Sequence, residues 1–133
     1  MTRAAAALVV YAKDPTRVAR FYEDVAGLRV TELDDAFILL EGAGVELVVH
    51  AIPAAIASTF EIAVPPERRE DGAIKPCFTV TDLQRARQRA AVGGGLLDPA
   101  ASEWTWRGLR HCDGHDPEGN VIQLRQPEAD TDR

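Results

Sequence analysis

The sequence contains few cysteines, no excess of positive charge and no long apolar run, and each shortage argues against a class of protein. Cys77 and Cys112 are the only cysteines among its 133 residues, so the sequence indicates no disulfide framework and favours a reducing cytoplasm. The net charge of −6 argues against a surface that binds nucleic acid or an anionic membrane. The apolar run at residues 4–12 is too short to span a bilayer.

The motifs of several enzyme classes are also missing. The sequence has no nucleophile elbow, no hydrolase triad in a known order and no phosphate-binding loop. Three glycines at residues 93–95 could suggest phosphate binding, but they follow a predicted helix and do not open one, so we interpret them as a helix cap and a turn. Hydrophobic residues make up 46% of the chain, which is enough for one domain with its own core.

One structural unit occurs twice, about 68 residues apart. Residues 8–14 form an apolar run that ends in Asp14, and residues 76–82 form a similar run that ends in Asp82. Each aspartate can cap a helix, and a glycine follows each predicted helix. A fold made of two similar halves usually has its functional cleft where the halves face each other.

Each copy has the pattern of one strand, one helix and three further strands. In the first copy we expect a strand at 7–12, a helix between Pro15 and Gly27, and strands at 28–33, 36–41 and 45–51. In the second copy we expect a strand at 74–81, a helix at 83–92, and strands near 95–98, 103–112 and 120–126. The sequence therefore predicts an α+β fold of two βαβββ modules in a single domain, with module 1 at about 6–52, a linker at 53–73, module 2 at about 74–127 and a disordered tail at 128–133.

Strand alternation predicts which side chains share a face of each sheet. The more apolar set, which should pack under the helices, consists of Leu8, Val10, Ala12, Phe78 and Val80. The opposite face carries polar and aromatic side chains among small apolar ones, namely Ala7, Val9, Tyr11, Glu46, Val48 and His50 in the first module and Lys75, Cys77, Thr79, Val121, Gln123 and Arg125 in the second. We interpret this second face as a binding cup.

Residues 116–120, with the sequence Asp-Pro-Glu-Gly-Asn before a last strand, complete a resemblance to a known family. Together with the βαβββ repeat, they resemble the vicinal oxygen chelate superfamily of glyoxalase I, extradiol dioxygenases, methylmalonyl-CoA epimerase and the bleomycin resistance proteins. The pair Phe21-Tyr22 before Leu28 fits as well. The resemblance covers about residues 6–127 and implies a cup-like pair of half-barrels and a homodimer.

Metal-dependent members of this superfamily place one ligand on the first and on the last strand of each module. The resemblance puts these positions at Ala7, Glu46, Lys75 and Gln123. Ala7 offers no donor atom, the ammonium of Lys75 would repel a metal, and Gln123 is a poor ligand. We therefore expect no metal or other cofactor, a condition similar to that of the bleomycin resistance proteins. In place of the metal we expect an ion pair between Lys75 and Glu46.

Two further clusters leave alternatives open. Residues 111–116 include His111, Cys112 and His115, but a turn at Gly114 should splay the side chains, and two ligands with a weak third are too few for a structural zinc site. A role at a pocket rim or in a turn is favoured there. Trp104 and Trp106 alternate on one strand, where they serve either in core packing or a dimer contact, or as a stacking wall for a planar or cationic ligand.

These observations support two functions of different classes. The first is a small cytoplasmic protein that binds a hydrophobic or amphipathic small molecule without a metal, as a homodimer with no nucleic-acid or membrane partner. The second is an enzyme of the superfamily, a lyase, isomerase or dioxygenase, that recruits Glu46, His50 or His111 in an unusual site. The residues at positions 7 and 75 favour the first. The candidate cup residues are Tyr11, Glu46, His50, Lys75, Thr79, Trp104, Trp106, His111, Gln123 and Arg125.

Overall fold

The first module forms a four-stranded sheet with the strand order β1-β4-β3-β2. The computed structural model describes residues 4–42 and 44–128. The elements of the first module are β1 (Ala6–Ala12), α1 (Pro15–Ala26), β2 (Arg29–Leu33), β3 (Phe37–Gly42) and β4 (Val45–Ala51). Strand β1 is parallel to β4, and the other neighbours are antiparallel. The predicted βαβββ order is confirmed.

The second module repeats this design in a sheet with the order β5-β9-β8-β6, to which β7 is added by pairing with β8. Its elements are β5 (Cys77–Thr79), α3 (Leu83–Val92), β6 (Leu96–Leu97), a 3₁₀ turn (Ala100–Ser102), β7 (Trp104–Trp106), β8 (Leu109–His115) and β9 (Val121–Pro127). Strand β5 is parallel to β9, as β1 is to β4. The α+β class and the pair of open half-barrels are therefore as predicted.

Both helices begin in the same way. Oδ1 of Asp14 accepts a hydrogen bond from the backbone N–H of Arg17, and Oδ1 of Asp82 accepts one from the backbone N–H of Arg85, each at 3.2 Å. Each aspartate satisfies an N–H group that the first helical turn leaves without a partner. Helix α1 ends at Gly27, whose φ of 73° lies in the left-handed region. The repeat seen in the sequence is thus also a repeat of local structure.

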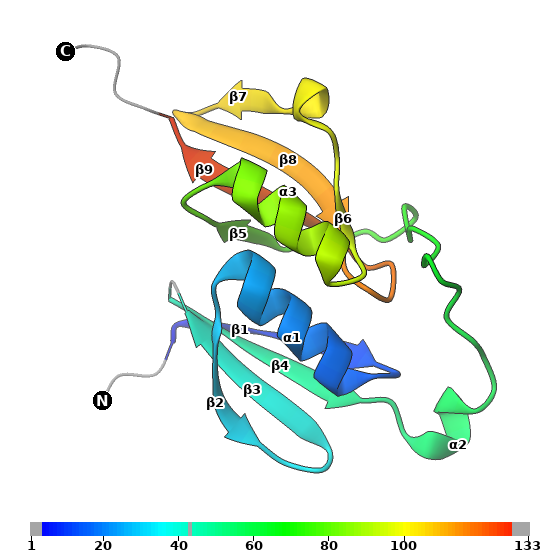
Figure 1. Cartoon of the computed structure of the whole chain (residues 1–133). Helices are drawn as coiled ribbons and strands as arrows, with labels where there is room; N and C mark the ends of the chain where they lie inside the picture. Colours follow the sequence, from blue (N-terminus) through cyan, green and yellow to red (C-terminus); the bar gives the residue numbers. More distant parts are fainter. Residues whose placement is uncertain (1–3, 43, 129–133) are drawn as a thin grey trace.

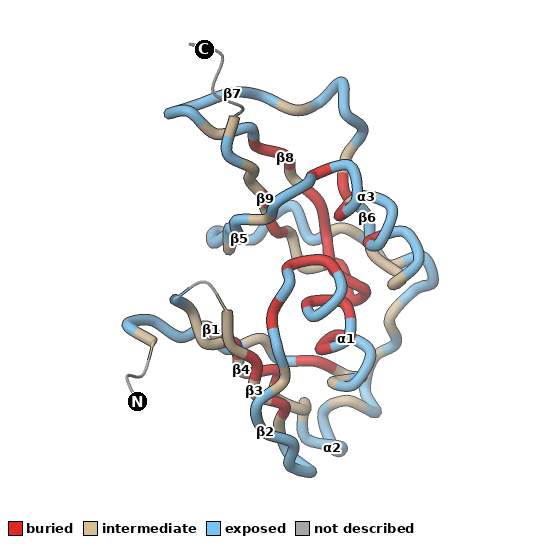
Figure 2. Tube along the Cα trace, turned by 60° about the vertical axis from the view of Figure 1, so that its left-hand side comes forward, coloured by how far each residue is buried: buried red, intermediate tan, exposed pale blue. Residues whose placement is uncertain are grey.

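The core of each module lies between its helix and one face of its sheet. The large buried residues of α1 are Val18, Phe21, Tyr22 and Val25. Along β1 the exposure alternates, because Ala12 is fully buried whereas Val9 and Tyr11 are 55% and 60% exposed. Figure 2 shows the buried residues gathered around the helices. The predicted assignment of the two faces is confirmed, and we call the helix-free side of both sheets the open face.

The two modules contact each other through their helices. Figures 1 and 2 show α1 beside α3, with both sheets on the same side of the helices and the edge strands β1 and β5 turned toward each other. The contact is close at Gly95, where an added Cβ would lie 2.4 Å from the carbonyl oxygen of His115 and 2.5 Å from the ring of Phe21. Residues 93–95 therefore form a helix end and turn, as predicted, and also leave room for the other module.

The turn at residues 116–120 joins the second module to the first, and we call it the inter-module turn. Asp116 is fully buried, and its carboxylate accepts hydrogen bonds from the backbone N–H groups of Glu118 and Asn120 and from the Asn120 amide. The hydroxyl of Tyr22 on α1 donates a further bond at 2.8 Å. Burial, and then the charge of Asp116, raise the pKa of Tyr22 well above its ordinary value. The phenol therefore stays protonated and stabilises a carboxylate that would otherwise be costly to bury.

Glu118 makes the second link of the inter-module turn. Its carboxylate accepts hydrogen bonds from the backbone N–H groups of Lys13 and Asp14, both at 2.8 Å, and the residue is 4% exposed. These N–H groups lie at the start of α1, where the helix dipole favours negative charge. In the same turn, a Cβ on Gly119 would lie 1.9 Å from the carbonyl oxygen of Glu67, so the linker packs directly on this glycine.

One expected strand was too long. The strand expected at 74–81 comprises only Cys77–Thr79. One reason is Pro76, which has no backbone N–H for the sheet ladder. Within the predicted linker at 53–73, Ala54–Ala57 forms the short helix α2.

The turn expected at Gly114 is also absent, because β8 continues through this glycine to His115. Gly114 pairs with Leu97 and Ile122, and a Cβ there would lie 2.2 Å from the carbonyl oxygen of Leu96. The glycine thus permits the close approach of β6 and does not end the strand.

The predicted disordered tail mostly falls at residues 129–133, which lie outside the described residues. Its first residue, Glu128, is held at the end of β9. The carboxylate of Glu128 accepts hydrogen bonds from Thr105 at 2.9 Å and from Arg110 at 3.1 Å, and its backbone N–H donates to Gly108 at 3.0 Å. Glu128, which was predicted to belong to the disordered tail, is therefore bonded to the second module.

We predict that Tyr22→Phe lowers the free energy of unfolding by about 1–3 kcal/mol, because it removes a donor from a buried carboxylate. Urea denaturation followed by circular dichroism measures this change. The matched control is Tyr11→Phe, which removes the same hydroxyl from an exposed ring and should change the free energy by less than about 0.5 kcal/mol. Equal losses in the two variants would contradict the role assigned to Tyr22.

Candidate functional site

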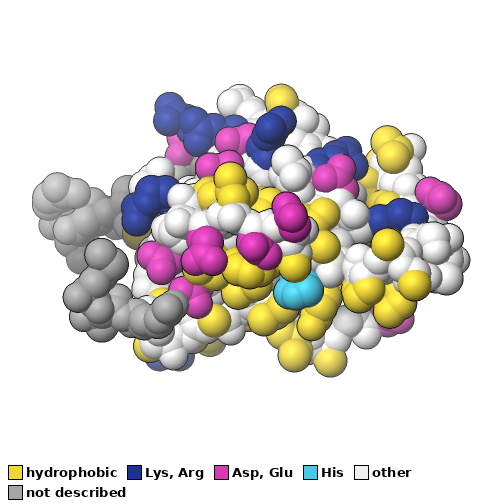
Figure 3. All heavy atoms as spheres, turned by 90° about the horizontal axis from the view of Figure 1, so that it is seen from below, with side chains coloured by type: hydrophobic (Ala, Val, Ile, Leu, Met, Phe, Trp, Pro, Cys, Tyr) yellow, Lys and Arg dark blue, Asp and Glu magenta, His cyan; other side chains and the backbone are white. Residues whose placement is uncertain are grey.

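The open face of the first sheet is largely apolar. The pairing of β1 with β4 sets Ala7 beside Glu46, Val9 beside Val48 and Tyr11 beside His50. The rings of Tyr11 and His50 lie 5.4 Å apart, centroid to centroid. Figure 3, which views the molecule from below, shows hydrophobic side chains gathered on this surface, with acidic side chains around them. This half of the open face can offer an apolar and aromatic wall to a ligand.

The open face of the second sheet is more polar, and four of its side chains lie directly opposite one another on four strands. They are Thr79 on β5, Arg125 on β9, His111 on β8 and Trp104 on β7, and we call them the cross-strand row. Nε of Arg125 donates a hydrogen bond to Oγ1 of Thr79 at 2.9 Å. The rings of Trp104 and His111 are stacked, with centroids 5.5 Å apart and 13° between their planes.

Gln123 lies beside the cross-strand row and contacts three of its neighbours. Its amide NH₂ donates to Oδ1 of Asp113 at 3.1 Å, so its Oε1 is directed to the other side as an acceptor. This oxygen lies 2.9 Å from Nδ1 of His111 and 3.3 Å from Sγ of Cys77. Gln123 therefore orients the imidazole of His111, which is only 2% exposed.

Lys75 has a partner that the sequence did not suggest. Its ammonium lies 2.9 Å from Oδ2 of Asp113, so the predicted ion pair with Glu46 was wrong. The reason is the strand register, because Asp113 lies opposite Gln123 in the same sheet, whereas Glu46 belongs to the first sheet. The side chains of Lys75 and Asp113 remain 38% and 25% exposed, so solvent weakens their interaction.

The strand register also changes which residue of the second sheet corresponds to Ala7. In the sequence, Ala7 lies seven residues before the capping Asp14, and Lys75 lies seven residues before the capping Asp82. In the sheets, however, Ala7 is paired with Glu46, and the residue paired with Gln123 is Cys77. Burial is the main cause that raises the pKa of the Cys77 thiol. With either assignment, Ala7 offers no donor atom and Gln123 is a poor metal ligand.

His111 and His115 are both fixed by their own neighbours. Because β8 is regular here, both side chains lie on the open face with Asp113, and the expected turn does not separate them. His115 is 7% exposed, and its Nδ1 lies 2.9 Å from the carbonyl oxygen of Asp116. Across residues 4–42 and 44–128, no group of three or more His, Cys, Asp or Glu side chains could hold a metal ion.

The two tryptophans lie on the surface and not in the core. Trp104 and Trp106 are 40% and 57% exposed, so the interpretation as core packing was wrong. Strand β7 carries them over the edge of β8, where Trp106 lies 5.8 Å from His111, centroid to centroid. The guanidinium of Arg107 lies 5.3 Å from the ring centroid of Trp106. The indoles can therefore form a stacking wall or a contact with another chain.

A hollow of about 400 Å³ lies beside the ion pair of Lys75 and Asp113. The linker residues Arg68 and Arg69 and the β9 residue Val121 line it as well. Because Arg68 also binds both carboxylate oxygens of Asp98, at 2.6 and 3.1 Å, the linker is held against the second module at this point. The hollow therefore has a defined wall on the linker side.

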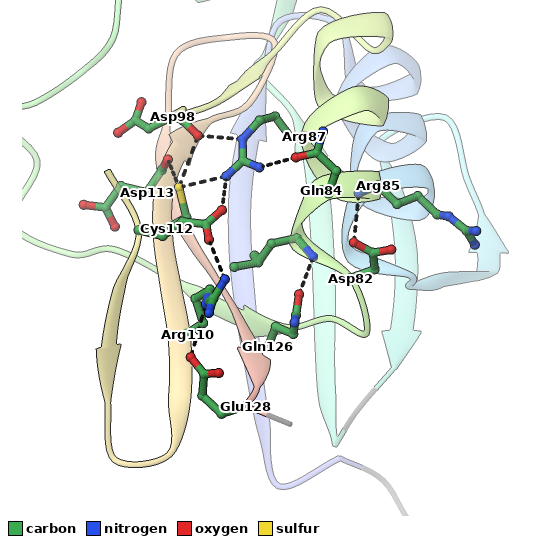
Figure 4. A network of polar contacts seen from close by, with 12 residues as sticks. Asp82, Gln84, Arg85, Arg87, Asp98, Arg110, Cys112, Asp113, Gln126 and Glu128 are labelled. Carbon is green, nitrogen blue, oxygen red and sulfur yellow. Dashed lines mark hydrogen bonds and ion pairs between the residues drawn. The ribbon is translucent and has the colours of Figure 1, made fainter. Parts of the chain in front are cut away.

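A separate polar network holds β8 from the helix side of the sheet (Figure 4). Nε of Arg87 on α3 donates to the carbonyl oxygen of Asp98 at 2.7 Å, and Nη2 of Arg87 lies 3.6 Å from Sγ of Cys112 and pairs with Glu103. Burial raises the pKa of the Cys112 thiol. Both Cys112 and Cys77 are free, and Cys112 alternates with the open-face residue His111, so this network supports the cross-strand row from behind without joining it.

Two βαβββ modules, helices on one side of both sheets and the inter-module turn together define a protein with the vicinal oxygen chelate architecture. The glyoxalase-like domain family matches residues 7–125, and the chain belongs to this family. A comparison with the curated proteins gave no match. No helix in the described part of the chain is both long and apolar enough to cross a membrane.

Solved structures show the same fold at low sequence identity. A glyoxalase/bleomycin resistance protein/dioxygenase family enzyme from Burkholderia phytofirmans PsJN is 18% identical, with a TM-score of 0.64 over 91% of this chain and 96% of that one. An integron cassette protein from V. cholerae is 20% identical, with a TM-score of 0.60 over 95% of both chains. A virulence protein from Salmonella typhimurium is 21% identical, with a TM-score of 0.60 over 96% of this chain and 98% of that one.

We predict that Lys75→Met lowers the free energy of unfolding by less than about 1 kcal/mol, because its ion pair with Asp113 is partly exposed. A pair buried in a dry cup would instead lose about 3–5 kcal/mol when one partner is removed. The measurement is a double-mutant cycle by urea denaturation with Lys75→Met, Asp113→Asn and the double variant. A coupling free energy above about 3 kcal/mol would show that solvent does not weaken this pair.

Proposed function

We propose that the protein binds a small hydrophobic or amphipathic molecule on its open face without a metal ion, as a binding protein of the glyoxalase and bleomycin resistance type. The observation that carries this proposal is the contrast between the two halves of the open face. The first sheet offers an apolar wall that includes Val9 and Tyr11, and the second offers the cross-strand row and the exposed indole of Trp106. Mostly apolar surfaces with a few well-placed polar groups are typical of small-molecule sites.

The side chains at the metal positions support a metal-independent function. With the strand register, the four positions are Ala7, Glu46, Cys77 and Gln123. Ala7 offers no donor atom and Gln123 is a poor ligand, so only Glu46 and Cys77 are ordinary ligands, and two are too few for a metal site. Gln123 already has its amide oxygen beside His111 and Cys77 and its NH₂ group bonded to Asp113. A metal at Gln123 would have to break these contacts.

The geometry of His111 supports binding over proton transfer. Its Nδ1 lies 2.9 Å from Oε1 of Gln123, and its Nε2 lies 3.3 Å from the carbonyl oxygen of Trp106. A general base needs a ring nitrogen within hydrogen-bond reach of the substrate proton. Both ring nitrogens of His111 already face acceptors of the protein, so this imidazole is better suited to holding the indole of Trp104 in place.

The binding proposal predicts saturable binding of the neutral apolar probe N-phenyl-1-naphthylamine, at close to one probe per chain. Both tryptophans of the chain lie at the open face, so energy transfer from them to the probe reports binding at this surface. Trp104→Leu should weaken binding several-fold. The matched control is Val92→Ala, which removes an exposed apolar side chain from α3 on the other side of the sheet. Equal weakening by both substitutions, or no saturable binding, would overturn the proposal.

The same proposal predicts far less than one Zn, Fe, Ni or Mn ion per chain in protein purified without a chelator. Elemental analysis measures the metal content, and the probe titration repeated with EDTA should give the same affinity. About one ion per chain, lost in the variant Glu46→Gln, would overturn metal independence and favour an enzyme of the superfamily.

We also propose that the chain forms a homodimer in the cytoplasm. Strand β7 lies off the main strand path of the second sheet and gives an outer strand with which a second copy could pair. Light scattering at micromolar concentration should show a species of twice the chain mass of 14.5 kDa. A 14.5 kDa species alone would contradict the dimer, and recovery of the untagged chain outside the cytoplasmic fraction of cells would contradict the location.

A further inference from the structure

We infer that the open face binds a planar aromatic carboxylate, with the aromatic ring on the tryptophans and the carboxylate on Arg125. This inference rests on the proposed small-molecule function and adds the chemical class of the ligand. It follows from three features of the second sheet, which are a cation without a carboxylate partner, exposed indoles on the same face, and the distance between them.

The cation is the guanidinium of Arg125. Within the described part of the chain its one hydrogen bond is from Nε to Oγ1 of Thr79, and it has no carboxylate partner. Asp113, the acidic residue of the neighbouring strand on this face, already binds Lys75 and Gln123. Arg125 is partly buried, so an anion placed beside it is less screened than on an open surface. A planar guanidinium can donate two parallel hydrogen bonds to a carboxylate.

The aromatic part of the site is formed by Trp104 and Trp106. Trp104 lies with one ring face on His111 and keeps 40% of its surface exposed. Trp106 keeps 57% exposed and lies next to the guanidinium of Arg107. Exposed indole faces stack well on planar rings, and this stacking is stronger when the indole is already held in position.

The cross-strand row places the cation and the indole at a suitable separation. The backbones of Arg125 and Trp104 lie on either side of His111, two strand spacings of roughly 5 Å each apart, and the bond from Nε of Arg125 to Thr79 holds the guanidinium at the β5 side of this row. An aromatic acid with two fused rings spans roughly this length when its carboxylate lies on Arg125. A single small anion such as acetate could reach the guanidinium but not the indole.

The net charge of the chain does not oppose this assignment. The chain carries a charge of −6, but charges more than about a Debye length away are largely screened, so the nearest groups dominate. On the open face Arg125 lies opposite His111 and Arg107 lies beside Trp106, while the neighbouring acids Glu103 and Glu128 are paired with Arg110. An anionic planar ligand is therefore favoured over the cationic one that the sequence had left open.

Calorimetry with two probes that share the naphthalene ring and differ in charge tests the inference. The probes are 2-naphthoate and the neutral alcohol 2-naphthalenemethanol. The unmodified protein should bind 2-naphthoate at least tenfold more tightly, because a bidentate bond to a charged group contributes more than a neutral one. Raising the salt concentration should reduce this preference.

Three variants separate the contributions of the cation and the indole. Arg125→Met should weaken 2-naphthoate binding at least tenfold and leave the affinity for 2-naphthalenemethanol within twofold, which also shows that the variant is folded. Trp104→Leu should weaken both probes. The control Arg20→Met removes an exposed cation from α1, on the helix side of the first sheet, and should change neither affinity.

The failures of this inference and of the proposed function have different signatures. Equal affinity for the two probes, or a preference for the acid that survives Arg125→Met, would overturn the inference and leave a small-molecule site in place. Binding of neither naphthalene probe would overturn the inference as well. The failure of N-phenyl-1-naphthylamine and of both naphthalene probes to bind would overturn the proposed function itself.

Discussion

The arrangement of the whole molecule depends on the buried carboxylate of Asp116 and on the turn that it stabilises. This turn belongs to the second module, but it is bonded to the first: Asp116 accepts a hydrogen bond from the hydroxyl of Tyr22, and Glu118 accepts two from backbone N–H groups at the start of α1. Each module alone is only about half of the chain, too short to bury a stable core by itself. The carboxylate contacts therefore act together with the packing of α1 on α3, and the two halves of the open face keep one relative position because of them.

The cross-strand row shows how the fold assembles a surface from distant segments. Thr79, Trp104, His111 and Arg125 come from four strands, and only the pairing of those strands makes them neighbours. The support for the row comes from behind the sheet, where Arg87 holds the strand that carries Cys112 against the Asp98 segment. Such support matters because a side chain in a binding site is useful only if its own position is held.

The positions at which the superfamily resemblance places metal ligands carry other kinds of side chain in this chain. The glyoxalase-like architecture remains complete over residues 7–125. At the centre of the second sheet, the amide NH₂ of Gln123 donates to Asp113, and its amide oxygen lies beside Nδ1 of His111. The oxygen, the atom of Gln123 that a metal would bind, therefore already has a partner in the protein. The remaining open groups are a guanidinium and two indoles, which suit recognition of an organic molecule.

The sequence by itself determined the local structure of this protein. Helix limits at Asp14, Asp82 and Gly27, the βαβββ order and the two faces of β1 all follow from capping, periodicity and strand alternation, which act over a few residues. The residues at the open face could be selected from the same alternation. Their neighbours could not, because a strand pattern does not specify which residue of another strand lies opposite.

Only the tertiary structure decided the contacts that depend on register and on packing between modules. The pairing of Lys75 with Asp113 depends on the register of β8 against β9, which sets Asp113 opposite Gln123, and on the bond from the Gln123 backbone N–H to the carbonyl oxygen of Pro76. The partnership of Cys77 with Gln123 follows from the register of β5 against β9. The exposure of the two tryptophans and the continuation of β8 through Gly114 depend on β7 and β6 packing at its edge. The physical reason is the same in each case. Hydrogen bonding between strands joins residues that are far apart in the sequence, and the sequence of one strand does not specify which residue of another strand lies opposite.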